Sequence, residues 1–191
     1  CGWGQPGLAA TWGPRLTSGE LLASYCLTEP DAGSDAANLK TSARLDGDGP
    51  DAVYVLKGSK AFISGAGSTD MLVVMARTGA PGARGITAFA VPADTPGIRY
   101  GKKEDKMGWN SQPTRAIFFD DVRVPVGNRL GEEGEGFRIA MKGLDGGRIN
   151  IATCSVGAAQ GALNAAQRYL GERRQFGKAL AEFQALQFRL A

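Results

Sequence analysis

The sequence predicts an α+β protein, with strands up to about residue 130 and helices after it. Short runs rich in Val, Ile, Phe and Tyr dominate the first part, and clusters of Gly, Pro, Asp and Ser separate them. In the second part, apolar residues recur at helical spacing in an Ala-rich background. Because the expected strands are short and closely spaced, the first part favours a small antiparallel barrel or sandwich.

The first part contains four clear strand patterns. They are runs of β-branched and aromatic residues bounded by turn formers, at 53–64, 70–77, 85–91 and 115–124. Proline lies at strand ends, where its missing N–H breaks no ladder, at Pro92, Pro96 and Pro125. No regular element is expected at 1–13, because this Gly-rich stretch has no apolar period.

The second part contains helical patterns at 136–144 and from Ile149 to Arg174. Gly177 interrupts the pattern, and a last amphipathic helix then begins, with an apolar face of Phe183, Leu186 and Leu190. That helix is still running at Ala191 without a cap, so we expect the chain to be a fragment.

Composition excludes several classes of function. Lys and Arg number 22 against 19 Asp and Glu, and the net charge of +3 is too small and evenly spread to indicate nucleic acid binding. The chain has no His, which excludes Ser-His-Asp and Cys-His catalysis within it. Its three Cys form no CxxC pair, so we expect no metal site, no disulfide scaffold and a reducing compartment. The longest apolar run, at 71–76, is too short to span a membrane.

The stretch YCLTEPDAGSD at 25–35 reads as a strand that ends in a turn of small residues. Such a turn exposes backbone N–H groups together with the hydroxyls of Thr28 and Ser34. These groups could bind a planar heterocycle or a phosphate. The alternative is an ordinary loop with a local side-chain turn.

The stretch KAFIS at 60–64 places two bulky apolar residues beside a serine at a strand end. Phe62 could back an aromatic cofactor while Ser64 offers a hydroxyl. The alternative is a core phenylalanine in an ordinary strand.

Arginines mark two further segments. Arg148 begins an apolar helix in GGRIN, and Arg173 and Arg174 end a helix in GERRQFG. The guanidinium donates two parallel hydrogen bonds to phosphate, so these residues could bind a phosphorylated ligand. The alternative for Arg173 and Arg174 is a favourable interaction with the helix C-terminus.

Five segments together resemble the acyl-CoA dehydrogenase family, in its order and spacing. They are YCLTEPDAGSD, KAFIS, the run at 106–125 with KMGW, TR and FFDDVRVP, EGFRIAMKGLDGGRINIA, and ERRQFGKALAEFQ. The likeness covers residues 15–191, whereas 1–14 do not match. It implies a leading segment at 1–23, a middle antiparallel β-barrel domain at 24–130, and at 131–191 the first helices of a truncated, up-and-down four-helix bundle.

The resemblance implies FAD-dependent α,β-dehydrogenation of a short branched-chain acyl-CoA such as isobutyryl-CoA. A hydride would pass to flavin N5 and the α-proton to a glutamate base. That base would lie beyond Ala191, so no catalytic residue is assigned within the chain. Glu172 and Glu182 are expected to lie on solvated helix faces instead.

The resemblance also implies which residues bind ligands. Thr28 would bond toward the flavin ring, and Phe62 would pack on it. Arg173 would reach the FAD pyrophosphate of a neighbouring subunit. The full set implied for FAD is Tyr25, Cys26, Leu27, Thr28, Ser34, Phe62, Ile63, Ser64, Arg173, Phe183 and Gln184. The set implied for acyl-CoA is Ser34, Asp145, Gly146, Gly147 and Arg148.

The partners implied by the resemblance are an electron-transfer flavoprotein as electron acceptor and further copies of the chain in a homotetramer, within the mitochondrial matrix. Neither nucleic acid nor a membrane is expected as a partner. Two alternatives remain: a non-catalytic fragment or isoform without activity alone, and an acyl-CoA oxidase of the same family.

Overall fold

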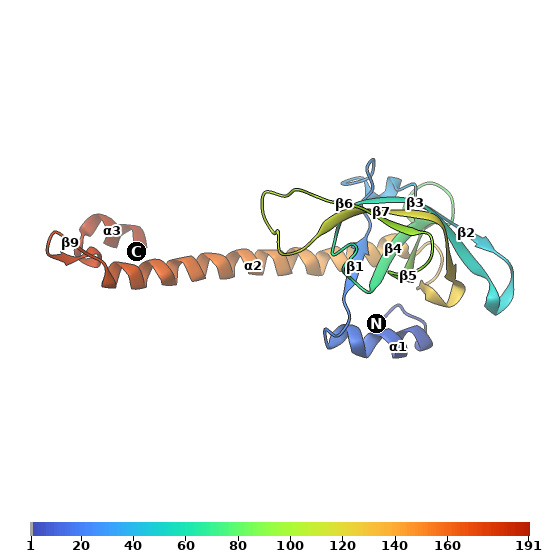
Figure 1. Cartoon of the computed structure of the whole chain (residues 1–191), viewed down its shortest axis with the longest axis horizontal. Coiled ribbons are helices and arrows are strands. Elements are labelled where there is room, and N and C mark those ends of the chain that lie inside the picture. The colour runs from blue at the N-terminus through green and yellow to red at the C-terminus, as the bar shows by residue number, and fades with distance from the viewer. Residues whose placement is uncertain (1) are drawn as a thin grey trace. The chain divides into compact units, whose positions relative to one another are not determined.

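The computed structural model describes residues 2–191, so Cys1 lies outside the described part of the leading segment. The chain divides into two compact units, one ending at Lys142 and the other running from Gly143 to Ala191. Figure 1 shows the sheet of the first unit and the long helix α2 (Gly136–Glu172), which begins in the first unit and continues through the second.

The first unit is built on one eight-stranded sheet in the order β6-β7-β3-β2-β4-β5-β8, with β1 beside β4. Its strands are β1 (Ala23–Cys26), β2 (Ser42–Asp46), β3 (Val53–Ser64), β4 (Met71–Arg77), β5 (Ile86–Pro92), β6 (Ile98–Lys103), β7 (Thr114–Pro125) and β8 (Arg129–Leu130). Strands β3, β4, β5 and β7 confirm the four strand predictions to within one residue at each end.

Two strand pairs depart from the antiparallel pattern that the sequence led us to expect. β1 pairs with β4 in parallel through residues 71–74, and β2 pairs with β4 in parallel at Arg77. The other strand pairs of the sheet are antiparallel, as expected. Between the two parallel contacts the chain leaves the sheet after Cys26, the last residue of β1, makes an excursion through 27–41, and returns to the sheet at Ser42, the first residue of β2. This excursion carries the turn that the sequence singled out.

A contiguous apolar core holds the sheet together. Tyr54 and Phe89 pack with ring centroids 4.8 Å apart, and Leu56, Val74 and Ile117 are fully buried around them. Burying each such side chain contributes about 1.5–3 kcal/mol before the cost of ordering it. The sheet is thus a rigid support for the turns at its ends.

The leading segment contains a helix, α1 (Pro6–Thr17), where no element was expected. Proline fits its first turn, where no N–H is required. Leu8, Trp12 and Leu16 recur at four-residue spacing and line an apolar cavity of about 220 Å³ shared with Met71 of β4. The glycines around these residues obscured that spacing in the sequence.

The second unit contains most of α2, a short hairpin and helix α3 (Gln184–Leu190). α2 continues for 37 residues through GLDGGR, so the two helical patterns at 136–144 and 149–174 form one helix. The hairpin pairs β9 (Arg174–Gln175) with β10 (Lys178–Ala179) around Gly177, whose φ is 81°. The break predicted at Gly177 is confirmed, although the next helix begins only at Gln184.

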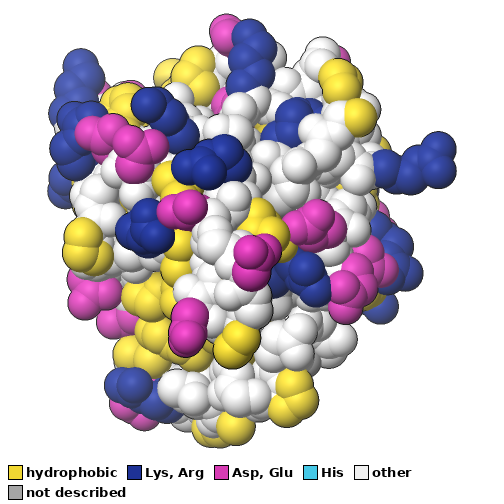
Figure 2. Space-filling view, turned by 90° about the vertical axis from the view of Figure 1, so that its right-hand side faces the viewer, with side chains coloured by type: hydrophobic (Ala, Val, Ile, Leu, Met, Phe, Trp, Pro, Cys, Tyr) yellow, Lys and Arg dark blue, Asp and Glu magenta, His cyan; other side chains and the backbone are white. Residues whose placement is uncertain are grey.

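Short 3-10 helices lie in the connections between these elements: η1 (Ala36–Asn38), η2 (Gly49–Asp51), η3 (Ala83–Gly85), η4 (Val126–Asn128) and η5 (Leu180–Glu182). On the face that Figure 2 shows, basic and acidic side chains are interspersed among uncharged atoms. Among residues 2–191, no helix has both the length and the apolar character needed to cross a membrane. The same residues contain no group of three or more Cys, Asp or Glu side chains arranged to hold a metal ion.

Candidate functional site

The structure brings together the two segments that the sequence proposed as a ligand site, 25–28 and 62–64. The Ala61 N–H donates to the Thr28 carbonyl at 2.9 Å, and the Ser24 hydroxyl donates to the Ser64 carbonyl at 2.8 Å. The end of β1 and the end of β3 are therefore joined side by side, although more than 30 residues of sequence separate them.

Phe62 has an unusual backbone and an exposed ring. Its φ is 56°, and the register between β3 and β7 shifts between Lys60 and Ile63, which marks a bulge. Phe62 is 67% exposed, so the alternative of a core phenylalanine is wrong. Bulges and positive φ values at bulky residues carry strain and cluster at functional sites. The bulge presents an aromatic face at the sheet end while Ile63 stays in the core.

Two hydroxyls accompany this ring. Thr28 is half-buried and Ser64 exposed, and within the part of the chain that the structure describes neither side chain has a hydrogen-bond partner. The Tyr25 hydroxyl, in contrast, donates to the Ala140 carbonyl at 2.9 Å. Burial raises the pKa of Tyr25 to about 12, so it remains a neutral donor.

The other residues of these segments face inward. Cys26, Leu27 and Ile63 are at most 6% exposed, so they can reach a ligand only through their backbone. Burial raises the pKa of the Cys26 thiol to about 12 although the Lys60 charge acts in the opposite direction. This cysteine is therefore protonated and unreactive at neutral pH.

The turn after Thr28 is closed by its own backbone. The Glu29 and Ala32 backbones exchange two hydrogen bonds, at 3.0 and 3.2 Å. The Asp35 carboxylate accepts from the Asn38 amide at 2.8 Å, whereas the Ser34 side chain is exposed. The features of an ordinary local turn are thus present, and Ser34 remains accessible beside them.

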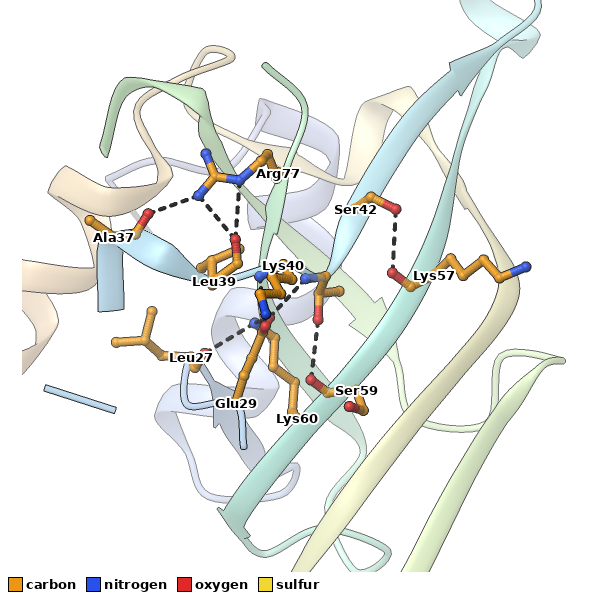
Figure 3. Close-up of polar contacts among 11 residues, drawn as sticks. Leu27, Glu29, Ala37, Leu39, Lys40, Ser42, Lys57, Ser59, Lys60 and Arg77 are labelled. Atoms are coloured by element: carbon orange, nitrogen blue, oxygen red, sulfur yellow. Dashed lines mark hydrogen bonds and ion pairs between the residues drawn. The ribbon is translucent and has the colours of Figure 1, made fainter. Parts of the chain in front are cut away.

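A buried ion pair beneath the turn was missed by the sequence reasoning. The Lys60 ammonium donates to a Glu29 carboxylate oxygen at 2.8 Å, and the two side chains are 0% and 7% exposed (Figure 3). Burial opposes the charge of Glu29, but the charge and hydrogen bond of Lys60, together with the hydrogen bonds of Thr41 and Lys40, outweigh it and lower the pKa of this carboxyl below its ordinary value. The available signal was a lysine inside an otherwise apolar strand end, which requires a partner when buried.

Four of the five residues implied for acyl-CoA, Asp145 to Arg148, occupy consecutive positions of α2. Arg148 and Asp145 form an ion pair at 2.9 Å, with both side chains 72% exposed. Such an exposed pair is worth little and breaks readily. Arg148 is therefore available to an anionic ligand, while Gly146 and Gly147 leave the helix surface open beside it, with no atom within 4 Å of an added Cβ.

The hairpin region of the second unit carries the remaining residues. Arg173 is exposed, and its carbonyl accepts from the Leu180 N–H at 2.8 Å. The Phe183 ring lies 6.3 Å from the Phe176 ring and 4.3 Å from the Lys178 ammonium. Gln184 is exposed at the start of α3. The hairpin therefore offers cations and aromatic rings to a ligand.

The first unit thus presents an exposed aromatic ring, two unpartnered hydroxyls and strand-end backbone in one place. This set fits a planar heterocycle, because the ring provides a stacking face and the hydroxyls can bond to heteroatoms. The isoalloxazine of FAD is such a heterocycle, so the residues present are compatible with the cofactor that the resemblance implies.

Comparison with known families places most of the chain in two adjacent domains. Residues 24–122 match the family described as "Acyl-CoA dehydrogenase, middle domain", and residues 134–191 match "Acyl-CoA dehydrogenase, C-terminal domain".

Similar proteins carry related names. Mitochondrial isobutyryl-CoA dehydrogenases from Bos taurus and Dictyostelium discoideum are 59% and 56% identical over 93% of this chain and 42% of their own. A short-chain acyl-CoA dehydrogenase from Megasphaera elsdenii is 49% identical over 92% of this chain and 45% of its own. The chain therefore spans less than half the length of these relatives.

Solved structures show the same fold. Butyryl-CoA dehydrogenase from Megasphaera elsdenii superposes with a TM-score of 0.91 and 46% identity, over 98% of this chain and 49% of that one. A structure described as the electron transferring flavoprotein of Acidaminococcus fermentans gives 0.91 and 44%, with the same coverage.

Proposed function

We propose a function from one premise: the chain belongs to the acyl-CoA dehydrogenase family. The proposed activity is FAD-dependent removal of hydrogen from the α and β carbons of a short branched-chain acyl-CoA. The branched-chain substrate class is supported by sequence identity. The chain is 59% and 56% identical to isobutyryl-CoA dehydrogenases and 49% identical to the short-chain relative.

Within this proposal the chain's first unit holds the flavin. Phe62 stacks on the ring, the hydroxyls of Thr28 and Ser64 donate to it, and the backbone of Tyr25, Cys26, Leu27 and Ile63 borders it. When bound, FAD would accept the hydride from the β carbon. The exposed ring and unpartnered hydroxyls at the joined strand ends support this arrangement.

Further contacts are proposed for each unit by itself. In the second unit, Arg148 binds an anionic group of CoA in place of Asp145. In the first unit, the Ser34 hydroxyl of the turn is a contact for acyl-CoA. Arg173 binds the FAD pyrophosphate of a neighbouring subunit, with Phe183 and Gln184 near the same cofactor. The exposure of these side chains supports the assignment, because an anionic ligand can reach each of them.

The base that takes the α-proton is proposed to be a glutamate outside these 191 residues. Glu182 accepts from the Ala179 N–H at 2.9 Å and caps a local turn, which leaves it a structural role. Glu172 lies exposed near the end of α2. Neither is assigned to catalysis.

We further propose that the protein is a mitochondrial homotetramer that passes electrons to an electron-transfer flavoprotein. The names of the two relatives above support the location. An acyl-CoA oxidase is the second candidate, supported by 33% identity to a structure described as a prolyl acyl carrier protein oxidase. Oxygen consumption without an added acceptor distinguishes the two.

The test is to purify the full-length protein and supply isobutyryl-CoA or butyryl-CoA with an artificial electron acceptor. The expected result is yellow protein with bound FAD, and a higher kcat/KM for isobutyryl-CoA. Protein without flavin would overturn the proposed function, and a preference for butyryl-CoA would overturn the branched-chain assignment alone. Light scattering measures whether the assembly is a tetramer.

A further inference from the structure

We infer that Glu29 and Lys60 are positioning residues, whose buried pair sets the relative placement of the segments at 25–28 and 62–64 and so shapes the flavin surface. The inference rests on the proposed function. Glu29 directly follows Thr28, and Lys60 lies two residues before Phe62. Neither side chain reaches the sheet-end surface itself, since both are buried.

The pair links the two segments through several bonds at once. The Lys60 ammonium donates to Glu29 Oε1 at 2.8 Å and to the Leu27 carbonyl at 3.0 Å. Beside them, the Ala61 N–H donates to the Thr28 carbonyl. Every residue from 27 to 29 is therefore bonded to residue 60 or 61, which leaves little freedom for one segment to slide along the other.

Glu29 also bonds the turn to residues 40 and 41, where the chain returns to the sheet. Its carboxylate accepts from the backbone N–H of Lys40 at 2.6 Å and from that of Thr41 at 3.0 Å (Figure 3). The Thr41 hydroxyl in turn donates to the Ser59 carbonyl at 3.2 Å. One carboxylate thus joins both ends of the excursion at 27–41 to strand β3.

Stability alone is a weak reason for such a pair. Desolvation of two buried charges offsets most of their attraction, so well-packed apolar replacements of similar volume are often equally stable. What apolar side chains cannot supply is direction, because hydrogen bonds fix distances and angles that packing leaves free.

The strained bulge at Phe62 is a feature that requires such directional bonds. Phe62 has a positive φ, whereas residues of a regular strand have negative φ values. Such backbone strain persists only where the surrounding structure enforces it. Lys60 anchors the strand at the residue where the register shift begins. The pair therefore holds the start of the bulge that turns the Phe62 ring outward.

The test compares three variants of the full-length protein: Lys60→Met, Glu29→Gln, and the two combined. Each single change leaves a buried group without its partner and should lower the thermal midpoint. The combined change removes both charges and should recover much of that loss. If the pair positions the flavin surface, the double variant still binds FAD about tenfold or more weakly, the effect of losing one charge-assisted hydrogen bond.

The second readout is the bound flavin itself. We expect the double variant to shift the visible flavin absorption bands and the flavin midpoint potential. The matched control is Val122→Ala, a core change on β7 at a position that pairs with Leu56 and lies outside both segments. It should leave the flavin spectrum unchanged.

Three results would overturn the inference. The double variant could bind FAD with unchanged affinity and spectrum, or lose no more affinity than Val122→Ala. It could also fail to fold, which would make the pair a requirement of the sheet rather than of the flavin surface. Absence of FAD from the unmodified protein would instead reject the proposed function, and this inference with it.

Discussion

The proposed flavin contacts rest on three side chains at two strand ends, those of Phe62, Thr28 and Ser64. The sequence could indicate these residue types and their place after apolar runs. It could not indicate that the Phe62 side chain is exposed. In a regular strand successive side chains face opposite sides of the sheet, and a bulge shifts this alternation. Lys60 was overlooked for a related reason: its partner lies 31 residues away in the sequence.

Removing the two unpartnered hydroxyls tests the flavin assignment at single residues. Thr28→Val combined with Ser64→Ala should weaken FAD retention, because each lost hydrogen bond to the ring costs about 1 kcal/mol. The measurement is the FAD dissociation constant of the full-length protein, together with its visible spectrum. Thr11→Val, on the exposed side of α1, is the matched control. Unchanged affinity and spectrum in the double variant would reject the role of both hydroxyls.

Glu29 should make the protein sensitive to acid. Lys60 and the backbone donors lower the pKa of Glu29 in the folded state, so the unfolded state binds the proton more tightly. Its stabilising contribution is therefore complete above the unfolded pKa of about 4.3 and is lost as pH falls through the lower folded pKa. Burial lowers the pKa of Lys60, yet this lysine stays protonated at acid pH and adds no slope there.

The measurement is the free energy of unfolding between pH 6 and pH 3, in the unmodified protein and in Glu29→Gln. The glutamine variant should be less stable at pH 6 and should lose less stability on acidification. Parallel curves for the two proteins would contradict the assignment of this titration to Glu29.

At the scale of elements, the sequence predicted the strands that are dense in β-branched and aromatic residues. It did not predict the strands of mixed composition. Strands β3, β4, β5 and β7 are dense in β-branched and aromatic residues, and the sequence located them closely. Strands β2 and β6 read SARLD and IRYGKK, where charged residues and glycine dilute the pattern. Their pairing with longer neighbours stabilises them, a contribution that no local pattern contains. The parallel attachment of β1 is likewise a tertiary property.

The junction of α2 with the sheet depends on one glycine. A Cβ added to Gly136 would lie 2.5 Å from the Thr87 carbonyl carbon and 2.7 Å from the Ala88 nitrogen, and backbone atoms cannot move aside cheaply. Gly136→Ala should therefore destabilise the protein by about 1–3 kcal/mol, as overpacking does. Chemical denaturation measures the change.

Gly7→Ala is the matched control for this variant. It lies in α1 with no atom within 4 Å of an added Cβ, so alanine should be neutral or stabilise by up to about 1 kcal/mol. Equal stability of Gly136→Ala and the unmodified protein would contradict the close approach of α2 to β5.

At the scale of the whole molecule, the second unit exposes a regular apolar stripe. Ile149, Val156 and Leu163 recur every seven residues along α2 and are 69%, 70% and 39% exposed. Alanines at 152, 159 and 166 fill the intervening positions of the same face. Apolar residues at this spacing are typical of a helix that packs along another helix. The stripe therefore supports the proposed assembly of the full-length protein into a helical bundle and tetramer.

A charge in the middle of this stripe tests that proposal. Val156→Glu should lower the thermal midpoint and shift the full-length protein to smaller or aggregated species, because the packed state would bury an unpaired carboxylate. The loss includes the apolar burial of the valine, worth about 1.5–3 kcal/mol. Gln160→Glu supplies a control with the same charge at a polar position, where Gln160 bonds to Asn164 at 2.8 Å on the helix surface. Size-exclusion chromatography with light scattering measures the mass. If the Val156 variant retains both the mass and the thermal midpoint of the Gln160 variant, the stripe faces solvent in the assembled protein and the helix packs through another face.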